Sequence, residues 1–194
     1  GCIDEADAIV SKAGGRSLPN SIPKLLSAHP FGNVNNMLGP DGERWVPVHG
    51  LVPHSRVVSV MDRIEALFAQ HGAAMDRLEV RHGYLLATVA TNCFVIEPVF
   101  FWPDELFEMH RRYVEADHLE RLPKREPNKA ARELVTTLKQ GLADLFRDEG
   151  AVHLQVAKAY HYHDGLKDAP LALAKSVKQI VDPKGRMNPG ALGF

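Results

Sequence analysis

Three polar residues lie in surroundings that could give them a catalytic or ligand-binding role. Glu97 lies within the apolar run Cys93–Trp102, and a charged, dry carboxylate is costly, so it must be paired, hydrogen-bonded or protonated. Glu97 therefore either points to solvent or to an arginine, or it faces a ligand as a base or hydrogen-bond acceptor. His153 and Gln155 alternate along an expected strand after Gly150. They share one face of that strand, toward a ligand or toward water.

The ten histidines raise the alternative of a metal site. His49 and His54 flank the end of an expected short strand, and His161 and His163 share a face if their segment is extended. With His153, these side chains could form a three-ligand site. No pair has the tight Cys/His spacing of a zinc site, so ordinary imidazoles are favoured and no metal is expected.

Other chemical motifs are missing from the sequence. There is no Gly-x-Ser-x-Gly elbow, the stretch Ala13-Gly14-Gly15-Arg16 is not a P-loop, and no Gly-x-Gly-x-x-Gly follows an expected strand. Cys2 and Cys93 are too few for a disulfide framework and fit a reducing compartment, so we expect a cytoplasmic protein. These patterns exclude the common nucleophile and phosphate-cradle enzymes.

The composition of the chain limits the classes of partner that we expect it to bind. The 194 residues carry a formal net charge of -1 with 45% hydrophobic residues, as in an ordinary globular protein. Near-zero net charge gives no reason to expect nucleic acid as a partner. No apolar run approaches the roughly 18 residues of a membrane helix, so no transmembrane segment is expected. Self-association into a homo-oligomer stays open.

Hydrophobic periodicity predicts the elements that must position these side chains. Apolar residues at helical spacing predict a helix that Ser55 caps and Gly72 ends, and a long helix that Asn128 caps. Further helices are expected over 103–116 and from Pro170 to Asp182, and strands over 45–52, 78–84, 85–90, 94–102 and 151–157. This order predicts an α+β fold, an antiparallel sheet covered by helices on one face, of ferredoxin-like type.

The end of the chain carries the most specific pattern. The amphipathic segment from Leu173 is followed by Asp182-Pro183-Lys184-Gly185 and by Asn188-Pro189-Gly190. This ending resembles that of the vanillyl-alcohol oxidase superfamily of FAD-linked oxidoreductases, which includes D-lactate and other 2-hydroxy-acid dehydrogenases. In physical terms, Pro183 and Gly185 stop the helix, and Asn188-Pro189-Gly190 forms a stiff second turn.

The resemblance implies a division of the chain. Residues 1–44 would be an irregular segment joining to an FAD-binding domain, 45–165 a cap (substrate) domain, and 166–194 a helix and tail returning to the flavin domain. The FAD-binding domain itself would lie in a missing N-terminal portion or in a partner chain. On this interpretation the cofactor is FAD, and Asn188 contacts the flavin or its domain.

The resemblance also implies an activity, hydride transfer from an alcohol carbon of a small-molecule substrate to flavin. Glu97, His153 and Gln155 are then the expected catalytic residues, with His49 a more distant candidate. Two departures from the family pattern argue against particular subgroups of the family. The segment Leu154–Ala157 stands where the metal-using members carry Glu-His-Gly. Gly150-Ala151 replaces the Tyr-Arg pair with which other members bind a phenolate. Phe94 and Val95 cannot attach flavin covalently, so FAD is expected to be dissociable.

A 2-hydroxy acid is therefore favoured over a phenolic alcohol as substrate. Arg81 and Lys158 are the cations that could bind its carboxylate, and Tyr84, Tyr160 and Tyr162 remain available to a phenolic substrate. The competing hypothesis is a non-enzymatic α+β module that binds a small ligand or self-associates. The 194 residues alone are expected to bind no flavin and to be inactive.

Overall fold

The chain folds as two compact units, Gly1–Val34 and Asn35–Phe194. The structure is a computed structural model and describes residues 1–32, 34–153, 155 and 158–194. The first unit holds α1 (Cys2–Lys12) and α2 (Ser21–Ala28). The second unit holds the sheet and the remaining helices. The functional division at residues 44 and 165 stays a prediction.

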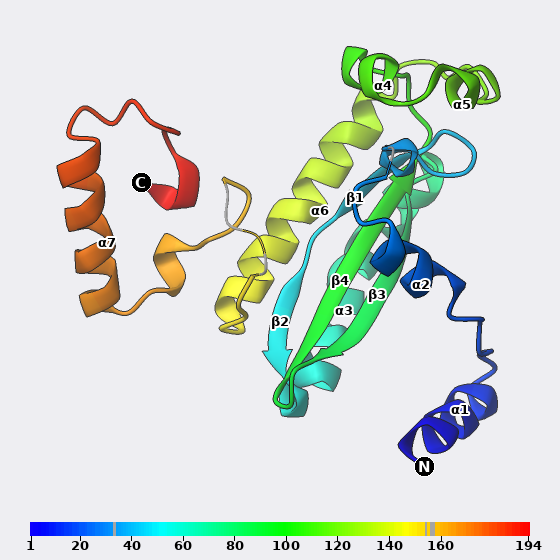
Figure 1. Cartoon of the computed structure of the whole chain (residues 1–194), viewed down its shortest axis with the longest axis horizontal. Helices are drawn as coiled ribbons and strands as arrows, with labels where there is room; N and C mark the ends of the chain where they lie inside the picture. Colours follow the sequence, from blue (N-terminus) through cyan, green and yellow to red (C-terminus); the bar gives the residue numbers. More distant parts are fainter. Residues whose placement is uncertain (33, 154, 156–157) are drawn as a thin grey trace. The chain divides into compact units, whose positions relative to one another are not determined.

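β4 is the centre of the sheet in the second unit. It pairs antiparallel with β1 and β2 along one edge and with β3 along the other (Figure 1). Beyond β2, Val152 forms an isolated antiparallel bridge with Leu51. The strands are β1 (Arg44–Pro47), β2 (Gly50–Pro53), β3 (Arg81–Val89) and β4 (Cys93–Trp102).

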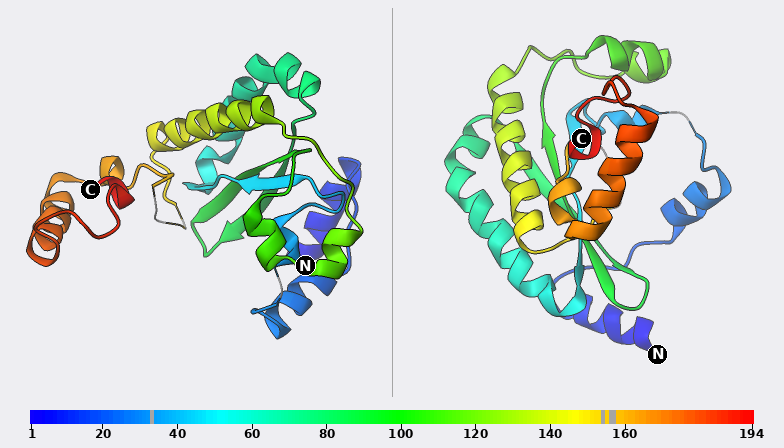
Figure 2. Two further views of the ribbon diagram at one scale, coloured as in Figure 1. Left: turned by 90° about the horizontal axis from the view of Figure 1, so that it is seen from above. Right: turned by 90° about the vertical axis from the view of Figure 1, so that its left-hand side faces the viewer.

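Two long helices cover one face of this sheet. α3 (Val57–Arg77) and α6 (Lys129–Asp148) lie side by side on it (Figure 2). Ile96 and Phe100 of β4 point into the same core as Ile64 of α3 and Leu138 of α6, and all four are fully buried. The order strand–helix–strand–strand–helix, with the Val152 bridge last, is the ferredoxin-like arrangement. The expected α+β fold with helices on one face is confirmed.

The cap of α6 follows the sequence prediction, whereas the ends of α3 do not. The Asn128 side chain accepts a hydrogen bond from the backbone N–H of Ala131 at 3.1 Å. The predictions of Ser55 as N-cap and Gly72 as the stop of α3 are wrong, because Arg56 is the N-cap and the helix continues to Arg77. Met75 is buried beyond Gly72, and this packing outweighs the low helix propensity of glycine.

Two neighbouring segments also differ from expectation. Glu79 adopts a positive φ of 57°, which delays the start of β3 to Arg81. The single helix expected over 103–116 is wrong, because the segment instead forms α4 (Glu108–Tyr113) and α5 (Ala116–Glu120). Asp104 is buried and accepts the backbone N–H of Glu105, so the first turn of the expected helix is replaced by an irregular strand end.

Among the described residues, the segment after Gly150 forms little of the strand that the sequence predicts there. Val152 makes its one bridge, and Leu154, Val156 and Ala157 lie outside the described residues. No helix among the described residues is long and apolar enough to cross a membrane. The remaining elements are η1 (Asn35–Met37), η2 (His54–Arg56), η3 (His163–Gly165), α7 (Asp168–Val181) and η4 (Ala191–Gly193).

Candidate functional site

A cluster of polar aromatic side chains lies beside β2, where the ring centroid of His153 is 6.2 Å from that of Phe146 in α6. Strand alternation sends Ile96 to the helix side, so Glu97 faces the opposite side. His49 lies between β1 and β2 and is 2% exposed. Its imidazole meets Tyr160, with ring centroids 4.9 Å apart, and His153 stacks near Tyr160 with centroids 4.2 Å apart.

The hydrogen bonds of His49 fix its tautomer. Its Nε2 accepts the backbone N–H of Gln155 at 3.2 Å, so the ring proton resides on Nδ1. That Nδ1–H donates to the hydroxyl oxygen of Tyr160 at 3.0 Å, and the His49 backbone N–H approaches the same oxygen at 3.4 Å. Burial, followed by the nearby His153, lowers the pKa of His49, so the ring stays neutral.

Tyr160 is thereby set up as a hydrogen-bond donor. Both contacts to its oxygen come from N–H groups of His49, so the phenol proton is directed elsewhere. Burial raises the pKa of Tyr160, and it outweighs the hydrogen bond from the His49 backbone, which lowers that pKa; the charge of Glu97 raises it further. The phenol keeps its proton at neutral pH and can donate it to a ligand oxygen.

His153 is set up in the opposite sense, as an acceptor. Its Nδ1–H donates to the carbonyl oxygen of His49 at 2.7 Å, which leaves Nε2 with a lone pair when the ring is neutral. Burial lowers the pKa of His153 despite this bond. A neutral imidazole with one fixed tautomer has the properties of a general base.

Glu97 of β4 adds an acidic group. It is half-buried, and burial raises its pKa. Its charge acts on Tyr160, which places the two groups within electrostatic reach. His153 and Tyr160 also line a cavity of about 180 Å³ together with Tyr162 and Leu166. The arrangement thus offers a proton acceptor and a hydrogen-bond donor beside one small cavity.

The site residues predicted from the sequence differ in whether they belong to this cluster. His153 and Glu97 belong to the cluster, and His49 is its buried centre. Gln155 contributes its backbone N–H, while its side chain is exposed. Asn188 is exposed in the tail and is not part of the cluster.

Of the histidines in the metal alternative, His49 and His153 share the cluster. His54 packs near Phe94, with ring centroids 6.1 Å apart, and the ring nitrogens of His161 lie 2.8 Å from a carboxylate oxygen of Asp144 and 3.2 Å from one of Asp164. Within the described residues, no group of three or more His, Cys, Asp or Glu side chains is arranged to hold a metal ion.

Tyr160 is the member of this cluster that the sequence indicated only as one of three tyrosines available to a phenolic substrate. It is 111 residues from His49 along the chain, in a segment without helical or strand periodicity. No local signal in the sequence brings these two side chains together.

The tail forms a well-defined structure of its own around Asp182. This carboxylate, 6% exposed, accepts hydrogen bonds from Lys178 Nζ at 2.6 Å and from the backbone N–H groups of Arg186 and Met187 at 2.9 Å. The hydrogen bond from Lys178 is the main cause that lowers its pKa to about 2. Asp182 therefore folds the Asp-Pro-x-Gly turn back onto the end of α7.

The apolar side of α7 is exposed, although amphipathic spacing of this kind predicts a buried side. Ile180 is 78% exposed, and none of the residues of α7 is buried. The side chains recur at helical spacing, so they form one stripe. The members of this α7 stripe are Leu173, Val177, Ile180 and Val181.

Comparisons of the chain with protein-family models, with curated protein sequences and with solved structures find no match.

Proposed function

We propose that this chain is the substrate-side portion of an FAD-dependent oxidoreductase acting on an alcohol carbon. The observation that carries the proposal is the cluster of His49, Tyr160 and His153 beside Glu97, in which hydrogen bonds set one group as acceptor and another as donor. Oxidation of an alcohol requires removal of the hydroxyl proton as hydride leaves carbon, and both groups serve that step.

In this proposal each residue has a distinct role. His153 accepts the hydroxyl proton of the substrate at Nε2, and Tyr160 donates a hydrogen bond to the same oxygen. His49 is a positioning residue, because it holds the Tyr160 oxygen through Nδ1–H and touches no substrate itself. Glu97 orients the substrate as a hydrogen-bond partner from the neighbouring strand. When bound, FAD supplies the hydride acceptor.

An exposed apolar surface in the last part of the chain supports a partner domain in this proposal. The α7 stripe needs an apolar partner, since contiguous exposed apolar surface marks a contact site, and burial of each of its side chains would contribute about 1.5–3 kcal/mol. The tail presents Asn188 at a positive φ of 46° in an exposed turn. We propose that this stripe and turn pack against the domain that binds FAD, with Asn188 at the flavin side.

A 2-hydroxy acid remains the favoured substrate class, with a phenolic alcohol second. Tyr160 and His153 act on the hydroxyl group that both classes share, so the cluster by itself does not separate them. Arg81, one of the two cations suggested for the carboxylate, pairs with Glu43 at 3.2 Å. D-lactate, glycolate and 4-hydroxybenzyl alcohol are the substrates with which to separate the classes.

The test uses the product of the whole gene that contains this sequence. The protein should carry flavin, and one of the three alcohols should reduce it under anaerobic conditions. His153→Gln should slow the reduction about 100-fold or more, as expected for loss of a general base, and His54→Gln, an exposed matched control, should not. A flavin-free whole protein, or reduction by none of the three alcohols, would refute the proposal.

Self-association is the second candidate function, because the α7 stripe could equally pair with that of another copy. In that case the 194 residues would form a dimer that Ile180→Asp disrupts, and the whole protein would lack flavin. Sedimentation and the visible absorption spectrum distinguish the two candidates.

A further inference from the structure

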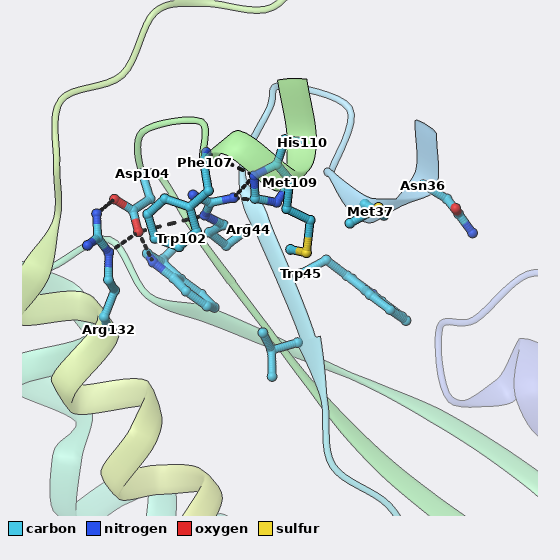
Figure 3. Close-up of a pocket in the computed structure, with 11 residues that line it drawn as sticks. Asn36, Met37, Arg44, Trp45, Trp102, Asp104, Phe107, Met109, His110 and Arg132 are labelled. Atoms are coloured by element: carbon cyan, nitrogen blue, oxygen red, sulfur yellow. Dashed lines mark hydrogen bonds and ion pairs between the residues drawn. The ribbon is translucent and has the colours of Figure 1, made fainter. Parts of the chain in front are cut away.

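A second cavity lies at the start of β1, whereas His49 follows the end of that strand. It has a volume of about 380 Å³, within the range of small-molecule pockets. It opens where β1 begins and β4 ends, and its lining combines large apolar side chains with two arginines (Figure 3). Neither its arginines nor its aromatic rings are used by the proposed function.

Arg44 is the polar side chain at the base of this cavity. Only 6% of its side chain is exposed, and its guanidinium lies 4.0 Å from the centroid of the Phe107 ring. In Figure 3, Arg44 lies between Asp104 and His110. A buried guanidinium needs acceptors for five N–H donors, because each buried donor without an acceptor is destabilising.

The surrounding residues satisfy Arg44 only in part. Its Nη2 donates to the carbonyl oxygen of Glu105, and its Nη1 lies against the imidazole of His110. Its Nε is buried and donates to no acceptor among the described residues. That Nε lies 3.7 Å from Asp104 Oδ2, which is too far for a hydrogen bond.

Asp104 cannot supply the missing acceptor, because its carboxylate is already engaged. Arg132 donates to both of its oxygens at 2.7 Å, and the backbone N–H groups of Glu105 and Asn128 donate at 2.9 Å. Trp102 Nε1 donates to Oδ2 at 3.2 Å. Burial and the positive charge of Arg44 lower the pKa of His110, so that ring adds no charge. Arg44 is thus left with donors for a further oxygen acceptor.

Three apolar side chains of the lining are accessible. Trp45 is 41% exposed, Met109 48% and Phe107 39%. Aromatic rings and a methionine sulfur favour contact with a flat apolar group. A planar carboxylate matches the geometry of a guanidinium better than a spherical or tetrahedral anion does. The lining therefore suits a molecule with a flat apolar body and one carboxylate.

We propose that this cavity binds a small aryl carboxylate, with the carboxylate on Arg44 and the ring against Trp45 and Met109. Such binding is separate from the proposed oxidoreductase function, because it uses no residue of the His49 cluster and needs no flavin. It can therefore be tested on the 194 residues as they are.

Intrinsic fluorescence gives a direct assay. The chain has two tryptophans, and both Trp45 and Trp102 line the cavity. Phenylacetate should change the emission saturably, with a Kd of about 1 mM or tighter for a ligand of this size. Phenylacetamide, its uncharged counterpart, and inorganic phosphate, which lacks the ring, should each bind about tenfold more weakly or not at all.

Variants at the rim avoid disturbing the buried arginine. Met109→Glu places a negative charge at the mouth of the cavity on an exposed position of α4, and it should weaken phenylacetate binding about tenfold or more while leaving the circular dichroism spectrum unchanged. Val58→Glu, at a residue of α3 that is 74% exposed, is the matched control and should bind as the unmodified chain does. The absence of saturable binding, equal binding of phenylacetamide, or undiminished binding by Met109→Glu would each overturn the proposal.

Discussion

Replacing Asp104 by asparagine exchanges a single side-chain atom, yet it should destabilise the fold by several kcal/mol. The Asp104 carboxylate is 1% exposed and joins the end of β4 to the start of α6, because it accepts the backbone N–H of Asn128 at 2.9 Å and both donors of Arg132 at 2.7 Å. In the variant the amide NH2 group would face the N–H donors of Arg132, and Arg44 would lose its nearest counter-charge.

The magnitude follows from the pKa of Asp104. Burial alone would raise this pKa, but the hydrogen bonds led by Arg132 outweigh it and lower the pKa from 3.8 to about 2. A lowering of that size corresponds to about 2.5 kcal/mol of stability at neutral pH. Removing one partner of a buried ion pair generally costs about 3–5 kcal/mol, so a loss of about 3 kcal/mol is expected.

Urea unfolding followed by circular dichroism measures this loss. Because the folded-state pKa is below the unfolded one, the contribution of Asp104 is complete above pH 3.8 and is lost as the pH falls toward 2. The difference between the unmodified chain and Asp104→Asn should shrink over that interval. Asp148→Asn is the control, since Asp148 is 54% exposed and pairs with Arg147 at the surface, and it should change stability by less than about 0.5 kcal/mol. A loss below about 1 kcal/mol for Asp104→Asn, or a difference that does not change with pH, would refute this reasoning.

Three other sites give predictions of their own. Gly50→Ala would place a Cβ 2.4 Å from Cδ1 of Phe146, so it should destabilise the fold by about 1–3 kcal/mol in urea unfolding, and an unchanged midpoint would contradict the packing described. The pKa of His153 is lowered, and the base acts when unprotonated. The rate of flavin reduction in the whole protein should therefore rise with pH through a pKa below 6.5 and be flat above it. A rate that rises only above pH 7 would assign the proton to another group. Ile180→Asp should leave the stability of the 194 residues within about 0.5 kcal/mol, because the side chain is 78% exposed, yet it should lower the flavin content of the whole protein, and full flavin retention would contradict docking through the α7 stripe.

Periodicity was sufficient to predict the framework of the sheet and its covering helices. Only a helix buries the apolar positions of α6, which end at Phe146, on one side. Only a strand buries the dense apolar run of β4. Element ends were less predictable. Gly72 has the residue type of a helix stop, but the buried Met75 shows that tertiary packing decides where α3 ends.

The candidate site was predictable only where local sequence carries the signal. Glu97 is conspicuous because its neighbours are apolar, and His153 because of strand alternation after Gly150. The pairing of His49 with Tyr160 depends on how the chain returns past β2 over 111 residues, which no local pattern encodes. The network of Arg44 and Asp104 was missed for the same reason, and it interrupts the helix that the sequence predicts from residue 103.

The exposure of the α7 stripe illustrates a different limit. Its amphipathic spacing predicts burial, yet in this structure Ile180 and Val181 remain 78% and 66% exposed. Sequence periodicity indicates that a surface is suited to burial, and it does not indicate which chain covers it.

The most direct test of the central claim is anaerobic titration of the whole gene product with D-lactate, glycolate and 4-hydroxybenzyl alcohol, followed by the flavin absorption band. We expect a protein purified with bound FAD whose band is bleached by one of these alcohols, rapidly with His153 intact and about 100-fold more slowly or worse in His153→Gln. A colourless protein that takes up no FAD, or a flavin that is reduced in His153→Gln at the unmodified rate, would contradict the proposed function.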